Sequence, residues 1–271
     1  MTNPNLEKAL ALDPSLIMEF AGKPPDPWQT NVLRKRPQQL LLNCSRQAGK
    51  TTTVSAGCID EALNPGSLTL ILSPSERQSA ELLRNVKSIY RTLGIEAHET
   101  AADNALKLEL ANGSRIIALP GGKEANVRGF AAVSLLIVDE ASRVPDDLYR
   151  AIRPMLAVSK GRLWVLSTPF GKRGFFFKEW SEGGPGWERV QVTADQCPRI
   201  TKEFLDEERR SMPENWFRQE YYCEFSETAG AVFRYDDVMG SLSDKVQPLF
   251  PDEESVNGGG ILSNEVQPLV F

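Results

Sequence analysis

The stretch Cys44-Ser45-Arg46-Gln47-Ala48-Gly49-Lys50-Thr51 decides how this chain folds. It fits the phosphate-binding pattern Gly, four residues, Gly-Lys-Ser/Thr at every position except the first, where Cys44 replaces glycine. An apolar run at 39–43 precedes it, and a stretch at 51–56 that can begin a helix follows it. A strand, a tight loop and a helix N-terminus direct backbone N–H groups and the positive end of the helix dipole toward one point. We therefore expect the loop to hold the phosphates of ATP, although an ordinary polar turn is the alternative.

Within such a loop the two last residues have separate tasks. Lys50 is expected to reach the β- and γ-phosphates, and the hydroxyl of Thr51 is expected to ligate Mg²⁺. The remaining residues of the loop, 45–49, would offer backbone N–H groups to the phosphates.

The composition limits the classes of protein to consider. The chain has 271 residues, of which 41% are hydrophobic and 25% charged, which is typical of a soluble domain with a large core. Its runs of apolar residues are all shorter than the roughly 18 of a membrane span, so we expect no membrane contact and a cytoplasmic location. The net charge of −5 argues against a protein that coats nucleic acid through a uniformly basic surface. With one histidine, His98, and four cysteines without paired spacing, mechanisms based on histidine or on zinc have little material.

Strands and helices alternate from residue 38 to about 192. Uninterrupted apolar runs, typical of strands covered on both faces, occur at 39–43, 68–73, 134–138 and 162–167. A long amphipathic helix is expected from residue 75 to Gly94, and two runs around Asn112-Gly113 predict a hairpin at 106–119. The fold class is therefore α/β, with a mostly parallel sheet flanked by helices and a hairpin insertion.

The C-terminal part has a different texture. Apolar residues at helical spacing on either side of Pro213 predict a helical linker subdomain at about 195–226, which we assign to one domain with residues 1–194. Residues 227–271 read as a short tail in which the segment Val-Gln-Pro-Leu occurs twice.

The apolar run at 134–138 is followed by two carboxylates, Asp139 and Glu140. Ligands of open α/β sheets bind at the carboxyl ends of the strands, so both acids should face the crevice that holds Lys50. Asp139 would hold Mg²⁺ together with Thr51, and Glu140 would polarise the water that attacks the γ-phosphate. Acids that merely cap the next helix are the alternative.

Two further pairs of residues are candidates for the same site. Ser167 and Thr168 close another strand, where their hydroxyls can bond the attacking water or Glu140 and so report the γ-phosphate; a simple turn before Pro169 is the alternative. Trp28 and Gln29 could stack on an adenine and hydrogen-bond it, or Trp28 could be a buried anchor.

Taken together, these residues resemble one family, the large-subunit terminases that pump DNA into the heads of tailed bacteriophages. The resemblance covers about residues 22–230. The motifs that carry it are Pro27-Trp28-Gln29, the loop 45–51 with its arginine, Arg128-Gly129-Phe130, Val138-Asp139-Glu140-Ala141, Ser167-Thr168-Pro169 with Gly171-Lys172-Arg173-Gly174, and Phe217-Arg218-Gln219-Glu220-Tyr221 with Cys223-Glu224-Phe225.

The resemblance implies a P-loop NTPase fold of the additional-strand, catalytic-glutamate (RecA/ASCE-like) type. It implies that Asp139 and Glu140 are the metal-associated and catalytic acids, and that Ser167-Thr168-Pro169 couples hydrolysis to motion. It also implies a ring in which Arg128 reaches the ATP of the neighbouring subunit, while Arg46 could instead supply a positive charge within its own subunit. The partners implied are double-stranded DNA, a portal protein and a terminase small subunit, in the host bacterial cytoplasm and transiently at the procapsid portal.

Two departures from the family pattern affect these expectations. Cys44 replaces a glycine, which the family tolerates. Family members also carry a C-terminal nuclease domain, whereas about 45 residues follow Phe225 here. The tail 227–271 could be the start of that domain, and we expect no DNA-cutting activity from this chain. The rival functions are a helicase-like DNA translocase, which needs a second motor domain, and a truncated remnant that binds nucleotide without hydrolysing it.

Overall fold

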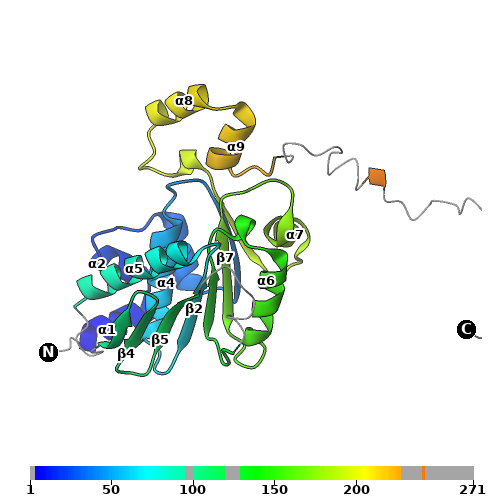
Figure 1. Ribbon diagram of the computed structural model, residues 1–271. Coiled ribbons are helices and arrows are strands. Elements are labelled where there is room, and N and C mark those ends of the chain that lie inside the picture. The colour runs from blue at the N-terminus through cyan, green and yellow to red at the C-terminus, as the bar shows by residue number, and fades with distance from the viewer. Residues whose placement is uncertain (1–3, 95–99, 120–128, 227–239, 242–271) are drawn as a thin grey trace, which may run out of the picture. The chain divides into compact units, whose positions relative to one another are not determined.

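The computed structural model describes residues 4–94, 100–119, 129–226 and 240–241 (Figure 1). The chain divides into two compact units, residues 1–230 and 231–271. The first unit contains an eight-stranded sheet with the strand order β3-β4-β5-β2-β6-β7-β1-β8. The strands are β1 (Gln39–Cys44), β2 (Leu68–Leu72), β3 (Thr100–Asn104), β4 (Lys107–Leu110), β5 (Arg115–Leu119), β6 (Leu135–Val138), β7 (Arg162–Ser167) and β8 (Glu188–Val192).

The centre of the sheet is parallel, as the apolar runs predict. β2 pairs in parallel with β5 and β6, β6 with β7, and β7 with β1. The side chains of β1 alternate between the two faces: Leu40 and Leu42 belong to one hydrophobic core, and Leu41 to the other. Both faces of the central sheet are covered, so every residue of β2 and β6 is buried. All of these residues except Thr69 are apolar, which explains why the two strands appear in the sequence as continuous apolar runs.

The predicted hairpin is confirmed, since β4 and β5 pair in antiparallel register. The structure adds two strands that the apolar runs did not reveal. β3 pairs with β4 at one edge of the sheet, and β8 pairs in parallel with β1 at the other edge. The hairpin therefore extends the main sheet through the parallel pairing of β5 with β2.

Helices cover both faces of the sheet, as Figure 1 shows. Helices α1 (Pro4–Leu12), α2 (Leu16–Phe20), α3 (Pro27–Lys35), α4 (Lys50–Ala62) and α5 (Glu76–Thr92) pack on one face. Helices α6 (Asp146–Ile152) and α7 (Gly174–Glu182) pack on the other. None of the helices in the described part of the chain is long and apolar enough to cross a membrane.

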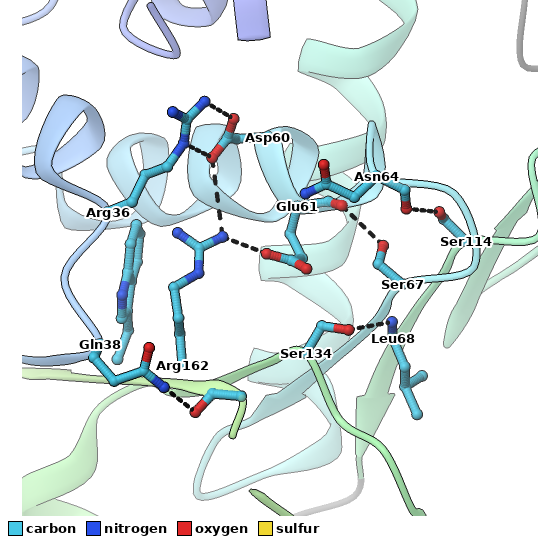
Figure 2. Close-up of polar contacts among 12 residues, drawn as sticks. Arg36, Gln38, Asp60, Glu61, Asn64, Ser67, Leu68, Ser114, Ser134 and Arg162 are labelled. Carbon is cyan, nitrogen blue, oxygen red and sulfur yellow. Dashed lines mark hydrogen bonds and ion pairs between the residues drawn. The ribbon is translucent and has the colours of Figure 1, made fainter. Parts of the chain in front are cut away.

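Helix α4, which follows the phosphate-binding loop, is fastened to β7 along its length. Gly57 allows a close approach, because a Cβ atom there would lie 2.3 Å from the ring of Trp164. At the far end of the helix, Arg162 of β7 forms an ion pair with Glu61 and lies 3.9 Å from Asp60. Arg36 binds Asp60 through two hydrogen bonds of 2.8 and 2.7 Å (Figure 2). This charge cluster fastens the C-terminal end of α4 to the first residue of β7, at the end of the helix that lies away from the phosphate-binding loop.

The predicted helices on either side of Pro213 are confirmed as α8 (Lys202–Ser211) and α9 (Glu214–Tyr222). They enclose a small core of their own, formed by Ala194, Leu205, Phe217 and Tyr221. The residue that follows α9 is tied to the sheet, because the Asn43 amide of β1 donates to the Cys223 carbonyl at 2.9 Å. The predicted boundary between residues 226 and 227 stays a prediction.

Candidate nucleotide site

The loop between β1 and α4 has the backbone of an anion-binding site. Gln47 and Gly49 adopt left-handed conformations, with φ values of +60° and +95°, and α4 begins at Lys50. Such a turn before a helix directs successive N–H groups inward. Cys44 is the last residue of β1 and is not left-handed, so a side chain fits where the phosphate-loop pattern has its first glycine.

Lys50 connects the loop to the end of β7. Its ammonium group donates to the carbonyl oxygens of Cys44 and Ser45 at 3.2 and 3.1 Å, and to the Thr168 hydroxyl at 3.1 Å. The residue is only 9% exposed, so this cation is held in place by its neighbours. The structure thus brings together the ends of β1 and β7 around one lysine.

Both acids at the end of β6 are half-buried. Burial raises the pKa of Asp139 to about 7, and the nearby Glu140 carboxylate adds to this shift while Lys50 opposes it. The Asp139 carboxylate also accepts a hydrogen bond of 2.9 Å from the Glu140 N–H. Glu140 has a φ of +48°, an uncommon conformation for a residue with a side chain, and its side chain lines the cleft described below. The strain is local to the place where a reacting water would be activated.

The end of β7 is bonded to the segment that follows the acids. The hydroxyls of Ser142 and Ser167 lie 2.7 Å apart, and the Ser142 hydroxyl donates to the Thr168 carbonyl at 2.9 Å. Hydrogen bonds thus link the segment after Glu140 to Ser167 and Thr168. That Ser167 and Thr168 couple hydrolysis to motion stays a prediction.

A cleft of ≈ 630 Å³ lies at this edge of the sheet. Most of the site residues predicted from the sequence line this cleft. Among those that do not, Ser45 and Ser167 are fully buried. Asp139 accepts a hydrogen bond from the backbone N–H of Glu140, which lines the cleft. The residues that line the cleft are Arg46, Gln47, Ala48, Gly49, Lys50, Thr51, Thr52, Gln78, Glu140, Arg143, Thr168, Pro169, Arg199 and Glu220.

Gln29 and Trp28 lie beside the cleft without lining it. The Gln29 amide oxygen accepts a bond of 2.7 Å from the Asp26 N–H, and its nitrogen donates to Thr53 at 2.8 Å and to the Gly49 carbonyl at 3.3 Å. Both ends of this amide support the phosphate loop, so a hydrogen bond to adenine would have to replace one of them. Trp28 packs against the core, and its buried indole N–H has no hydrogen-bond partner among the described residues. Contacts of both residues with a base stay predictions.

Two ion pairs at the cleft were not found from the sequence. Arg199 binds Asp26 through bonds of 2.9 and 2.7 Å and lies 3.4 Å from the Ala48 carbonyl. The Arg46 guanidinium forms an ion pair with the Glu220 carboxylate of α9, and the backbone N–H of Arg46 donates to the backbone carbonyl of Glu220 at 3.0 Å. The Arg46–Glu220 pair and the bond from Arg199 to the Ala48 carbonyl both join the loop to the segment after β8. The partners are separated by more than 170 positions in the chain, so no local pattern predicts them.

Two residues considered in the sequence lie outside the described residues. These are Arg128, predicted to act on a neighbouring subunit, and His98. The role of Arg128 therefore stays a prediction.

Known proteins with similar sequences fall in one family. A model of that family, described as terminase large subunit, T4likevirus-type, N-terminal, matches residues 41–239. The large terminase subunit of Escherichia phage T5 is 27% identical over 237 residues, which are 83% of this chain and 53% of the relative. The chain spans about half the length of the curated relatives it matches.

Solved structures agree with this result. The ATPase domain of the Thermus phage P74-26 large terminase is 26% identical, with a TM-score of 0.68, and the match covers 79% of this chain and 99% of that domain. The large terminase of bacteriophage HK97 has a TM-score of 0.62 at 19% identity, over 83% of this chain and 56% of the other, which supports the fold alone. The sheet and helices are therefore those of an additional-strand P-loop NTPase. The family model spans most of the chain, and this protein belongs to the terminase large subunit family.

Proposed function

We propose that this chain binds and hydrolyses ATP in the cleft at the ends of β1, β6 and β7, as the ATPase part of a DNA-packaging motor. The single observation that supports this most strongly is the meeting of Lys50, Glu140 and Thr168 at one cleft, from three strands far apart in the sequence. The similarity to a large terminase ATPase domain over 99% of its length supports the same function.

The proposed hydrolysis needs placement and charge compensation more than covalent chemistry. The oxygen of a water forms a bond to the γ-phosphorus while the bond from that phosphorus to the bridging oxygen of ADP breaks. Glu140 accepts the proton that the water loses and passes it to solvent. Lys50 and the N–H groups of the loop balance the negative charge on the phosphates.

The oxygen donors at the cleft fit Mg²⁺. Thr51 lies in the first turn of α4 and lines the cleft, and Asp139 is a carboxylate held directly behind Glu140. Hydroxyl, carboxylate and phosphate oxygens are the ligands that Mg²⁺ prefers. When bound, the ion would neutralise charge on the β- and γ-phosphates. Thr51 and Asp139 are the residues we assign to it.

An arginine is expected to complete the site, and two are candidates. Arg46 lines the cleft but is paired with Glu220, so within its own subunit it would have to exchange that carboxylate for a phosphate. Arg128 would act on the ATP of a neighbour in a ring. Through the Arg46–Glu220 pair, changes at the γ-phosphate would reach α9 and move bound DNA.

As a motor the chain would act with double-stranded DNA, a portal protein and a terminase small subunit, as a homo-oligomeric ring in the host cytoplasm and at the procapsid portal. Membership of the family supports these partners.

Mixing of inactive variants tests the ring and identifies the arginine. If Arg128 acts in trans, Arg128→Ala and Glu140→Gln are each inactive, and a mixture regains ATP hydrolysis because one subunit supplies the arginine and its neighbour the glutamate. If Arg46 acts in cis, a mixture of Arg46→Ala with Glu140→Gln stays inactive, since each subunit's own site then lacks one of the two groups and no neighbour can supply it. Activity that is independent of protein concentration and unaffected by Arg128→Ala would contradict the ring.

A further inference from the structure

Two arginines lie over the ring of Phe170, directly after the coupling segment. The guanidinium carbon of Arg143 is 4.0 Å from the ring centroid, and that of Arg173 is 4.7 Å from it. They come from different elements, because Arg143 ends the short helix after Glu140 and Arg173 precedes α7. Stacking of a guanidinium on an aromatic ring fixes its plane and leaves the N–H donors at its edge free for oxygen ligands.

Neither guanidinium has a carboxylate partner among the described residues. The other arginines around the cleft are neutralised, since Arg46 pairs with Glu220 and Arg199 with Asp26. Two unpaired positive charges held on one ring repel each other, and an anion between them would relieve that repulsion. The arrangement is thus prepared for a doubly charged ligand.

The arginines line a pocket of ≈ 400 Å³ that adjoins the nucleotide cleft. Arg46, Arg143 and Glu220 line both cavities, so the two share a wall. The wall is close to the reacting end of the cleft, because Arg143 is three residues from Glu140 and Phe170 two residues from Thr168. The pocket presents three guanidinium groups and one carboxylate. An anion released beside Glu140 would therefore lie close to this pocket.

We propose that this pocket, formed by Arg143, Arg173 and Phe170, binds the inorganic phosphate released by hydrolysis before it reaches solvent. The inference rests on the proposed ATPase function. Hydrogen phosphate carries about two negative charges and three acceptor oxygens near neutral pH, and planar guanidinium groups bind such oxygens in pairs. A phosphate of the DNA backbone has the same chemistry, but the shared wall with the nucleotide cleft favours the product.

Binding of radiolabelled inorganic phosphate to the full chain, measured by equilibrium dialysis in the presence of ADP, tests the proposal. Arg173→Ala is the informative variant, because Arg173 lines the pocket and not the nucleotide cleft. We expect it to weaken phosphate binding by about tenfold or more, the factor that corresponds to one lost charge-assisted hydrogen bond. Arg150→Ala is the matched control, since Arg150 is an exposed arginine outside both cavities. Equal phosphate binding by Arg173→Ala and wild type overturns the proposal.

Two further measurements separate the possible failures. Single-turnover hydrolysis of ATP by the same proteins reports the proposed function itself, and Arg173→Ala should hydrolyse bound ATP at the wild-type rate while phosphate inhibits its steady-state turnover less. Wild-type protein that binds phosphate without hydrolysing ATP refutes the ATPase and leaves an anion pocket without a product. Arg173→Ala that loses affinity for a short DNA duplex but keeps phosphate binding makes the pocket a DNA contact and refutes the inference.

Discussion

Substitution of Gly57 by alanine is expected to destabilise the protein, although alanine normally stabilises a helix. In the interior of an exposed helix the change from glycine to alanine contributes about 1 kcal/mol of stability. At this position the new methyl group would lie 2.3 Å from one ring carbon of Trp164 and 2.8 Å from another. Ordinary carbon–carbon contacts begin at about 3.5 Å, so the helix and the strand would have to separate by about 1 Å.

The ring of Trp164 cannot easily move away. Its side chain is fully buried, and the indole N–H donates a bond of 2.9 Å to the Pro37 carbonyl. Overpacking of a rigid core costs about 1–3 kcal/mol, and we take the upper end because two ring atoms are too close. After subtraction of the helix term, Gly57→Ala should lower the free energy of unfolding by about 2 kcal/mol.

Equilibrium unfolding in urea, followed by circular dichroism, gives the free energy of unfolding of Gly57→Ala and wild type. The double variant Gly57→Ala/Trp164→Phe removes the ring atoms that collide, so it should be more stable than the sum of the two single effects by about 1–2 kcal/mol. A Gly57→Ala protein as stable as wild type, or single effects that simply add, would refute the close packing of α4 on β7.

Three more predictions follow from buried groups. Arg162→Ala leaves the Glu61 carboxylate buried without its partner and should cost about 3–5 kcal/mol in urea unfolding. Arg162→Met restores packed volume but not the charge, so it should cost less than Arg162→Ala and still destabilise the protein; a methionine variant as stable as wild type would contradict the role of the charge. Thr53→Val removes the acceptor of the Gln29 amide and should cost about 1–3 kcal/mol, measured against Thr52→Val on the cleft side, and no difference between the two would contradict the role of that bond. Burial raises the pKa of all four cysteine thiols, Cys44, Cys58, Cys197 and Cys223. A thiol reagent should therefore label the native protein at pH 8 far more slowly than the urea-unfolded protein, and fast labelling of the native protein would contradict their burial.

The parallel centre of the sheet was predictable because its strands are buried on both faces, which demands long apolar runs such as that of β2. The two edge strands were not. β3 is the polar segment Thr100–Asn104, and four of the five residues of β8 are half-buried or exposed, so neither has an apolar run. An edge strand has a single neighbour in the sheet and needs no apolar run; β8 pairs with β1, which is distant in the sequence, whereas β3 pairs with the nearby β4.

The site was predictable to the extent that it consists of short motifs. Lys50, Glu140 and Thr168 were found because each belongs to a short motif that follows a buried strand, and parallel strands place their carboxyl ends at one edge. Glu220 and Arg199 were not assigned to the site, because they reach the loop through tertiary packing of the segment after β8. The expectation that the chain does not cut DNA concerns residues outside the described part and stays a prediction.

Hydrolysis of ATP by purified wild-type protein and by Glu140→Gln, with Mg²⁺ and at high protein concentration, tests the central claim most directly. The variant keeps Lys50 and the phosphate loop, so it should bind a fluorescent ATP analogue like wild type. Because it lacks the proton acceptor, it should hydrolyse ATP at least about 100-fold more slowly. Equal turnover by both proteins would show that Glu140 is not the base, and no turnover by wild type would contradict the proposal that this cleft is an ATPase site.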